Sequence, residues 1–198
     1  MSCIAIIPAR GNSQRIPFKN IRLFHGKPII AYAIEAARAS KLFNEIIVST
    51  DNERIVAVAK RYMAKVHMRP ARLAVDNVGT QEVMKCAINW WNVCHPKRKV
   101  EMAACLYATT PMMTAADIRR CYDTVIEHGL DYAYIEGWCY VGAAERFLNN
   151  VPVSAADGTP LNNSTVHRLS VGDRWIDINV EEDFQRAEIM YGAIKETA

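Results

Sequence analysis

The sequence lacks any long hydrophobic run. Its uninterrupted apolar segments are short, like residues 4–9, whereas a membrane-spanning helix needs about 20 consecutive apolar residues. The first residues also lack the basic region and the small-residue cleavage site of a signal peptide. We therefore expect no membrane partner and a cytoplasmic location.

Cysteine pairs of the Cys-x-x-Cys type are absent as well. The six cysteines are scattered, most of them within apolar segments, which is typical of reduced thiols in a cytosolic protein. This distribution argues against a disulfide-stabilised scaffold and against a zinc ribbon.

Common nucleotide-binding and nucleic-acid-binding signatures are missing too. There is no Gly-x-x-x-x-Gly-Lys-Ser/Thr phosphate loop and no Gly-x-Gly-x-x-Gly dinucleotide fingerprint. Residues 1–41 carry seven Lys or Arg against one acid, a net charge of +6, which raises nucleic acid as a partner. However, the sequence has no basic recognition helix and no aromatic RNA-binding strand, and the rest of the chain is acidic. We therefore expect no nucleic-acid partner.

What the sequence does contain is enough apolar material for a core. It is 51% hydrophobic and 23% charged, and its 198 residues suit a single domain over 1–198. Short apolar runs, which are typical of buried strands, alternate along the chain with segments whose apolar residues have helical spacing. Strands are predicted over residues 3–8, 45–50, 102–107, 131–135 and 174–178. Helices are predicted over residues 28–40 and about 81–92, and after Asp51, Thr114 and Asn179.

Four helix starts carry recognisable capping residues. Asp51 and Thr80 are expected to cap the helices that follow them. Thr114 and Asp117 have the spacing of a capping box. Asn179 precedes the last predicted helix and is also a good cap.

The predicted strands are apolar on both faces, which indicates a mostly parallel sheet covered by helices on both sides. This pattern predicts an α/β, Rossmann-like three-layer sandwich. Ligands of such sheets bind beyond the carboxyl ends of the strands. We therefore expect residues 9–20, the tip after Thr50, residues 107–114 and residues 177–179 to share one rim. Residues 149–165 are predicted to form a surface loop.

The densest cluster of charged and turn-forming residues is the loop after the first strand. Its exposed backbone N–H groups can cradle phosphate oxygens, and Arg10, Arg15 and Lys19 add positive charge. A solvated basic turn is the alternative interpretation.

The segment IAIIPARGNSQRIPFKN resembles the N-terminal signature of the CMP-sugar synthetases, which are the acylneuraminate and pseudaminic acid cytidylyltransferases. Four further blocks resemble the same family in the same order, namely residues 26–62, 69–80, 105–114 and 177–191. The resemblance covers most of residues 3–128 and 174–195. It implies a fold of the nucleotide-sugar transferase type.

The resemblance also implies a reaction and a set of site residues. CTP and an acidic sugar, a nonulosonic acid, would give a CMP-sugar and pyrophosphate, with Mg²⁺ as the cofactor. Arg10 and Lys19 correspond to catalytic, triphosphate-binding residues. Asp177 and Asn179 occupy the metal-binding positions. The implied nucleotide-binding residues are Ala9, Gly11, Asn12, Ser13, Arg15, Asn20, Arg69 and Thr80.

The sequence departs from the family pattern in three places. Gln14 stands where the family has a loop lysine, and Asn179 replaces the second acid of Asp-x-Asp. The family's long excursion after residue 136, which helps to bind the sugar and build a dimer, is shortened. The shortening leaves the acceptor and a homodimer open. Two alternatives therefore remain: a catalytically impaired nucleotide-binding relative, and a nucleotidyltransferase with a different acid-sugar acceptor.

Overall fold

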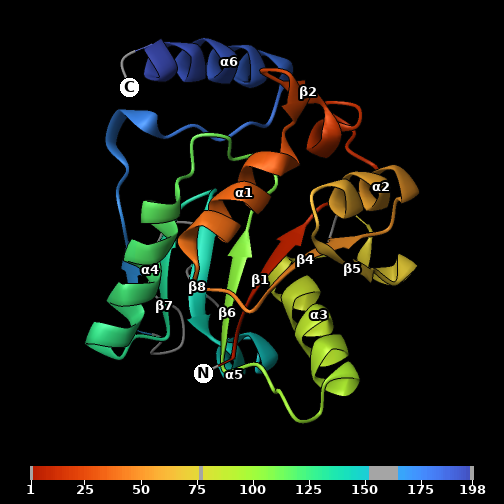
Figure 1. Cartoon of the computed structure of the whole chain (residues 1–198), viewed down its shortest axis with the longest axis vertical. Coiled ribbons are helices and arrows are strands. Elements are labelled where there is room, and N and C mark those ends of the chain that lie inside the picture. The colour runs from red at the N-terminus through yellow and green to blue at the C-terminus, as the bar shows by residue number, and fades with distance from the viewer. Residues whose placement is uncertain (1, 76–77, 152–164, 197–198) are drawn as a thin grey trace.

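The computed structural model describes residues 2–75, 78–151 and 165–196. They form a seven-stranded sheet in the order β5-β4-β1-β6-β8-β7-β9, with helices on both sides (Figure 1). The predicted α/β class with a mostly parallel sheet is confirmed. The predicted loop over 149–165 lies largely outside the described residues.

The strands of the main sheet are short. They are β1 (Cys3–Pro8), β4 (Glu45–Thr50), β5 (Lys65–Met68), β6 (Met102–Leu106), β7 (Tyr132–Ile135), β8 (Cys139–Ala143) and β9 (Val166–Arg168). A separate hairpin joins β2 (Leu23–Phe24) to β3 (Lys27–Pro28). The helices are α1 (Ile30–Ser40), α2 (Glu53–Arg61), α3 (Thr80–Cys94), α4 (Ala115–His128), α5 (Ala144–Leu148) and α6 (Glu181–Glu196).

Strand β1 lies at the centre of the parallel part of the sheet. Ile6 pairs with Ile47 of β4 on one side and with Cys105 of β6 on the other. Strand β8 runs antiparallel to both of its neighbours, β6 and β7, while β9 pairs with β7 in parallel. The carboxyl ends of β1, β4 and β6 therefore open on the same edge of the sheet.

The two faces of the sheet are buried in separate hydrophobic clusters. Side chains alternate between the faces of a strand, so Ala5 and Ile7 of β1 face one cluster, and Ile4 and Ile6 face the other. Helices α1, α2, α4 and α6 contribute to the first cluster, and α3 and α5 to the second. This double burial accounts for the apolar character of the strands on both faces.

The strand predicted over residues 174–178 is wrong. A 3₁₀ turn, η3 (Gly172–Arg174), occupies its start, and no regular structure follows before α6. Ile176 and Ile178 are buried on either side of Asp177, so the segment alternates like a strand. Its hydrogen bonds are made with side chains instead of a neighbouring strand. For example, Trp138 Nε1 donates to the Ile176 carbonyl oxygen at 2.9 Å.

Three strands of the main sheet, and both strands of the β2–β3 hairpin, were not predicted from the sequence. Strands β5 and β9 are short edge strands. Strand β8 follows Gly137 and fills the sheet between β6 and β7. Helix α5 begins directly after β8 ends at Ala143. None of the helices in the described ranges is long and apolar enough to cross a bilayer.

Candidate active site

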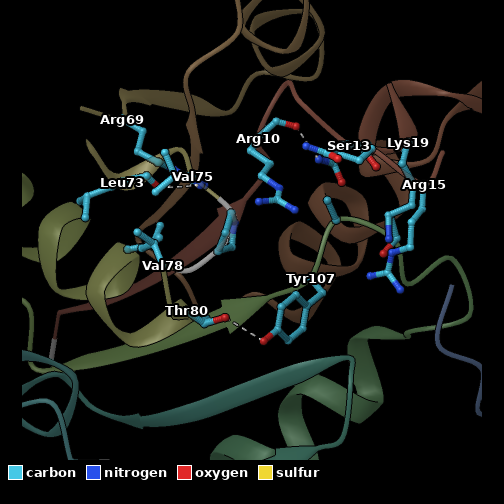
Figure 2. Close-up of a pocket in the computed structure, with 16 residues that line it drawn as sticks. Arg10, Ser13, Arg15, Lys19, Arg69, Leu73, Val75, Val78, Thr80 and Tyr107 are labelled. Carbon is cyan, nitrogen blue, oxygen red and sulfur yellow. Dashed lines mark hydrogen bonds between the residues drawn. The ribbon is translucent and has the colours of Figure 1, made fainter. Parts of the chain in front are cut away.

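A cavity of about 620 Å³ opens at the carboxyl edge of the sheet, beside β1 and β6 (Figure 2). Its wall is built by the loop after β1, the segment between β5 and α3, the start of α3 and the residues after β6. The lining residues are Pro8, Arg10, Ser13, Gln14, Arg15, Lys19, Asn20, Arg69, Leu73, Val75, Val78, Thr80, Val83, Tyr107, Ala108 and Thr109. Seven of the sequence-predicted site residues are in this lining.

One side of the cavity is basic. Arg10, Arg15 and Lys19 all come from the loop after β1, and Figure 2 shows Arg15 and Lys19 together, with Arg10 between them and the valines. Burial lowers the pKa of Lys19, and the neighbouring Arg15 and Arg10 lower it further, whereas Asp177 opposes the shift. The Lys19 ammonium donates a hydrogen bond to the Ile178 carbonyl at 2.6 Å. A concentrated positive charge of this kind is suited to a polyanionic ligand.

The backbone N–H groups of this loop are less available than predicted. The Ala9 N–H donates to the Ser49 carbonyl at 2.9 Å. The Gly11 N–H donates to Asp51 Oδ1 at 2.8 Å. The Ser13 N–H turns back to the Gly11 carbonyl at 3.3 Å. Ala9, Gly11 and the exposed Asn12 are not among the residues that line the cavity, so the phosphate cradle stays a prediction for these three positions.

Asp51 therefore has a different role from the one predicted. Helix α2 is capped by Asn52, whose side chain accepts from the N–H groups of Arg54 and Ile55. Asp51 instead connects the end of β4 to the loop after β1 through Gly11. The two loops are packed so closely that a Cβ atom on Gly11 would lie 2.5 Å from Asn52 Nδ2. Only glycine fits there without a shift.

The opposite side of the cavity is largely apolar. Leu73, Val75 and Val78 lie there, before the start of α3. Val83, from the first turns of α3, also lines the cavity. The predicted cap at Thr80 is wrong, because Gly79 is the N-cap and Thr80 is the first helical residue. The Thr80 hydroxyl instead lies 3.0 Å from the Tyr107 hydroxyl across the floor of the cavity. Burial raises the pKa of Tyr107, so this phenol stays protonated at neutral pH.

Arg69 lines the cavity, but its guanidinium makes hydrogen bonds mainly with other groups of the protein. Nη2 donates to the Ser49 carbonyl at 2.7 Å, at the end of β4. Ser49 Oγ lies 3.1 Å from Nδ1 of His67. Burial, assisted by the Arg69 charge, lowers the pKa of His67 to about 4, so the imidazole is neutral near pH 7. Arg69 thus fixes the apolar wall as well as adding positive charge.

The segment with Asp177 and Asn179 lies beside the basic loop, outside the cavity lining. Asn179 Nδ2 donates to Asp177 Oδ2 at 2.6 Å, and Arg15 Nη2 donates to Asn179 Oδ1 at 3.2 Å. The Asn179 side chain does not cap α6. Asp183 reaches back instead and accepts from the N–H groups of Asn179 and Val180. The four rim segments predicted to meet are therefore neighbours in the structure.

The donor set for a metal ion is small. Among the described residues no group of three or more His, Cys, Asp or Glu side chains could hold a metal ion. Asp177 offers a carboxylate, but the oxygen of Asn179 already accepts from Arg15. Mg²⁺ commonly binds through one or two carboxylates together with substrate phosphates and water. The site therefore suits Mg²⁺ only when a phosphate ligand supplies further oxygens.

Asp51, which holds the loop after β1, and Tyr107, which lines the cavity, were given no role in the site from the sequence. Asp51 was interpreted as a cap because an acid after a strand and before a helix suits that role. Tyr107 was expected on the rim with residues 107–114, but it carries no charge, so its local pattern indicated no specific contact. The signal for both was their place at the carboxyl ends of β4 and β6.

Comparison with known proteins gives consistent results. The family profile described as cytidylyltransferase matches residues 4–191. The pseudaminic acid cytidylyltransferase of Campylobacter jejuni is 38% identical over 130 residues, which cover 65% of this chain and 55% of that protein. The N-acylneuraminate cytidylyltransferase of Escherichia coli is 37% identical over 115 residues, covering 58% and 26%. The chain thus spans about half the length of the Campylobacter relative.

Solved structures share the fold. The structure of CMP:2-keto-3-deoxy-manno-octonic acid synthetase complexed with CTP superimposes with a TM-score of 0.77 at 15% identity, covering 98% of this chain and all of that one. A cytidylyltransferase from Leptospira borgpetersenii gives 0.73 at 13% identity, with 100% and 95% coverage.

Proposed function

Since the chain belongs to the cytidylyltransferase family, we propose that it is a CTP-dependent enzyme that transfers CMP to a nonulosonic acid and releases pyrophosphate. The acceptor class is supported by the 38% identity to a pseudaminic acid cytidylyltransferase. A hydroxyl of the acid would attack the α-phosphorus of CTP, and the bond to the pyrophosphate leaving group would break.

The observation that carries the proposal is the division of the cavity into a basic and an apolar side. Four cations line it, and none of its described lining residues is acidic. A triphosphate fits the side with Arg10, Arg15 and Lys19. A nucleoside fits the side with Thr80 and the valines, where hydroxyl groups provide a few directed hydrogen bonds within an apolar wall.

The basic side chains would act mainly on the leaving group. Negative charge builds up on the pyrophosphate as the bond breaks, and preorganised cations stabilise charge that develops in a transition state. Lys19 is held in place by the Ile178 carbonyl before any ligand arrives. Arg15, held by Asn179, provides a second donor close to the position where the family's loop lysine is replaced by Gln14.

The proposed cofactor is Mg²⁺, with Asp177 as its protein ligand. A divalent ion bound to Asp177 and to the phosphates would neutralise charge on the leaving group. Asn179 would orient the Asp177 carboxylate through its amide group, at 2.6 Å, rather than bind the ion. The ammonium of Lys19 would be a source of positive charge separate from the ion.

The experiment is calorimetric titration of CTP, with UTP and ATP as controls, in the presence and absence of MgCl₂. Selective CTP binding is expected, followed by pyrophosphate release when a panel of acid sugars is added. Lys19→Met should weaken CTP binding about tenfold or more, because a hydrogen bond to a charged group contributes about 1.5–3 kcal/mol. Lys60→Met, at an exposed position of α2, is the matched control. Folded protein that binds no nucleotide would contradict the proposal.

A second candidate is a nucleotide-binding relative with impaired catalysis. The contact between Arg15 and the Asn179 oxygen favours it, because a metal ion would have to compete with the positively charged guanidinium beside this oxygen. The same titrations separate the two: an impaired relative binds CTP but releases no pyrophosphate with any acceptor in the panel. Release with an acid sugar outside the nonulosonic class would indicate a different acceptor.

A further inference from the structure

The segment between η3 and α6 has no regular secondary structure, although it contributes groups to the candidate site. It places Asp177, the Ile178 carbonyl and Asn179 beside the basic loop, yet it pairs with no strand. A segment without a hydrogen-bonded ladder must be positioned by other contacts, because ordering each of its residues costs backbone conformational entropy. The contacts at Arg174, where the segment begins, are the most extensive of these.

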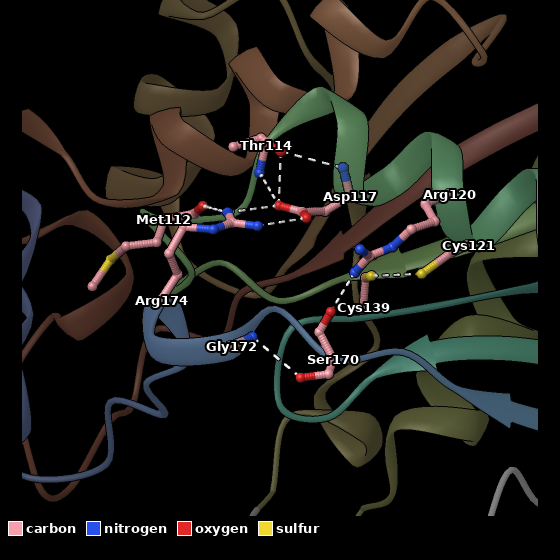
Figure 3. A network of polar contacts seen from close by, with 9 residues as sticks. All are labelled: Met112, Thr114, Asp117, Arg120, Cys121, Cys139, Ser170, Gly172 and Arg174. Atoms are coloured by element: carbon pink, nitrogen blue, oxygen red, sulfur yellow. Dashed lines mark hydrogen bonds and ion pairs between the residues drawn. The ribbon is translucent and has the colours of Figure 1, made fainter. Parts of the chain in front are cut away.

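Arg174 makes a forked contact with a buried carboxylate (Figure 3). Its Nη2 lies 2.8 Å from Asp117 Oδ1, and its Nη1 lies 3.0 Å from Asp117 Oδ2. Nη1 also donates to the Met112 carbonyl at 3.1 Å. The Asp117 side chain is only 5% exposed. A two-point contact of this kind fixes direction as well as distance, which a single ammonium group cannot do.

Asp117 is itself rigidly held. It belongs to the capping box of α4, where it accepts from the Thr114 N–H at 2.9 Å and from the Thr114 hydroxyl at 2.7 Å. Its carboxylate therefore connects the first turn of α4 to the Arg174 guanidinium. The position of Arg174 is thus set by a helix that packs against the sheet, rather than by the surface loop around it.

From Arg174 the chain is held at short intervals up to the site. Trp138, which is fully buried, donates from Nε1 to the Ile176 carbonyl at 2.9 Å. Lys19 then donates to the Ile178 carbonyl at 2.6 Å. Between these two contacts stands Asp177. The anchors at Arg174 and Trp138 therefore determine where the Asp177 carboxylate and the Ile178 carbonyl lie.

We infer that Arg174 is a positioning residue for the reaction, which acts through residues 175–178 on Asp177 and Lys19. The inference rests on the proposed function. Arg174 is absent from the cavity lining, so the role that we infer for it does not include contact with CTP. Loss of the Arg174 fork should let the segment shift, which weakens metal binding in the nucleotide complex more than it weakens CTP binding itself.

The test compares Arg174→Gln and Arg174→Lys with a matched control, Arg146→Gln. Arg146 also pairs with a largely buried carboxylate, Asp131, at 2.8 Å, but at the start of β7 on the opposite edge of the sheet. Both glutamine variants should lose comparable thermal stability, because each leaves a carboxylate without its cation. Only the Arg174 variants should change the properties of the site.

The main readout is Mn²⁺ affinity, measured by electron paramagnetic resonance on protein saturated with a non-reactive CTP analogue. Arg174→Gln should weaken Mn²⁺ binding about tenfold, within the range typical of outer contacts of a metal site. Arg174→Lys should give an intermediate loss, and Arg146→Gln none. In turnover, kcat should fall in the Arg174 variants while the KM for CTP changes little.

A double variant, Arg174→Gln with Asp117→Asn, separates positioning from stability. It removes the uncompensated buried carboxylate, so thermal stability should recover while Mn²⁺ affinity stays low. Recovery of both would overturn the inference, as would unchanged Mn²⁺ affinity in Arg174→Gln. Wild-type protein that binds no CTP would instead contradict the proposed function, so the two failures are distinguishable. If Arg174→Gln does not fold, Arg174→Lys and the double variant provide the same comparison.

Discussion

Gly11 shows how a single missing side chain sets the geometry of the site. The end of β4 and the loop after β1 meet there, with Asn52 against the glycine and Asp51 on its N–H group. A methyl group on Gly11 would lie 2.5 Å from Asn52 Nδ2 and 2.6 Å from Asn52 Cβ. Since real Cβ atoms do not approach other heavy atoms so closely, one of the two loops must move.

We therefore expect Gly11→Ala to reduce both stability and CTP affinity. Displacement of Asn52 would cost about 1 kcal/mol through the lost cap of α2, and displacement of the loop would move Arg10. Thermal unfolding and CTP titration measure the two effects. Gly192→Ala, within α6, is the control, because a Cβ at Gly192 would meet only His25 Cε1, at an ordinary contact distance of 3.7 Å. Equal behaviour of the two variants would contradict the close packing.

The hydrogen bonds of Asn179 hold the site together without a metal ion. Its amide is a donor to Asp177 and its oxygen an acceptor from Arg15, so the contact pattern is complete without a metal ion. An aspartate at this position would face another carboxylate at close range. The two like charges would repel each other until a cation binds between them.

Asn179→Asp should therefore lower the thermal stability of the metal-free protein and make it responsive to MgCl₂. The midpoint of unfolding should rise more on addition of MgCl₂ for the variant than for the wild type, because the ion stabilises only the folded state. Asn89→Asp, which adds the same charge at an exposed position of α3, is the control. A variant that gains no response to MgCl₂ would show that residues 177 and 179 do not share an ion.

At the scale of the elements, the two residues that precede helix α2 have different roles. Asn52 caps the helix, with Oδ1 accepting from the Arg54 N–H at 2.9 Å and from the Ile55 N–H at 3.4 Å, whereas Asp51 holds the N–H of Gly11. Asn52→Ala should speed hydrogen exchange of the Arg54 amide and cost about 1 kcal/mol. Asp51→Ala should speed exchange of the Gly11 amide instead. Amide exchange measured by NMR gives both, and the reverse pattern would restore the predicted cap at Asp51.

The elements also show where the sequence is sufficient and where it is not. Strands β1 and β4 match their predicted bounds, because a continuous apolar run in a central parallel strand is buried on both faces. The segment near Ile176 alternates between buried and less buried residues as a strand does, but it hydrogen-bonds to a side chain and not to a neighbouring strand. Sequence periodicity alone cannot detect this difference. Strand β8 was missed because Gly137 and Gly142 make its local propensity weak.

The site was predictable to a similar degree. The basic residues of the loop after β1 could be identified because charge and turn residues cluster there, and the family resemblance added Arg69 and Thr80, which line the cavity. The resemblance could not show that Arg69 donates to Ser49, or that the Gly11 N–H is already bonded. Such contacts depend on how distant loops pack, and the sequence does not encode them locally.

At the scale of the whole molecule, the basic segment 1–41 meets an acidic segment beside the site. The acidic segment, residues 173–198, carries seven acidic residues against three basic ones. Arg22 pairs with Glu181 through two contacts, at 2.5 and 2.7 Å, and Lys19 and Arg15 contact residues 178 and 179. Figure 1 shows α6 at the same end of the molecule as the β2 strand. The acidic segment therefore offsets part of the positive charge at the rim, while the cations that line the cavity face no acidic lining residue in the described ranges.

This distribution predicts that CTP affinity depends strongly on ionic strength. Dissolved ions screen charges separated by more than about 10 Å at 0.1 M salt, and Arg10 and Arg15 are partly or fully open to solvent. Between about 50 mM and about 500 mM NaCl the Kd for CTP should rise severalfold. The Kd for cytidine, which lacks the phosphates but would use the same apolar wall, should stay nearly constant. Lys19→Met should flatten the salt dependence for CTP, since it removes one of the cations. Parallel salt dependence of CTP and cytidine, measured by calorimetry, would show that the basic side does not hold the triphosphate.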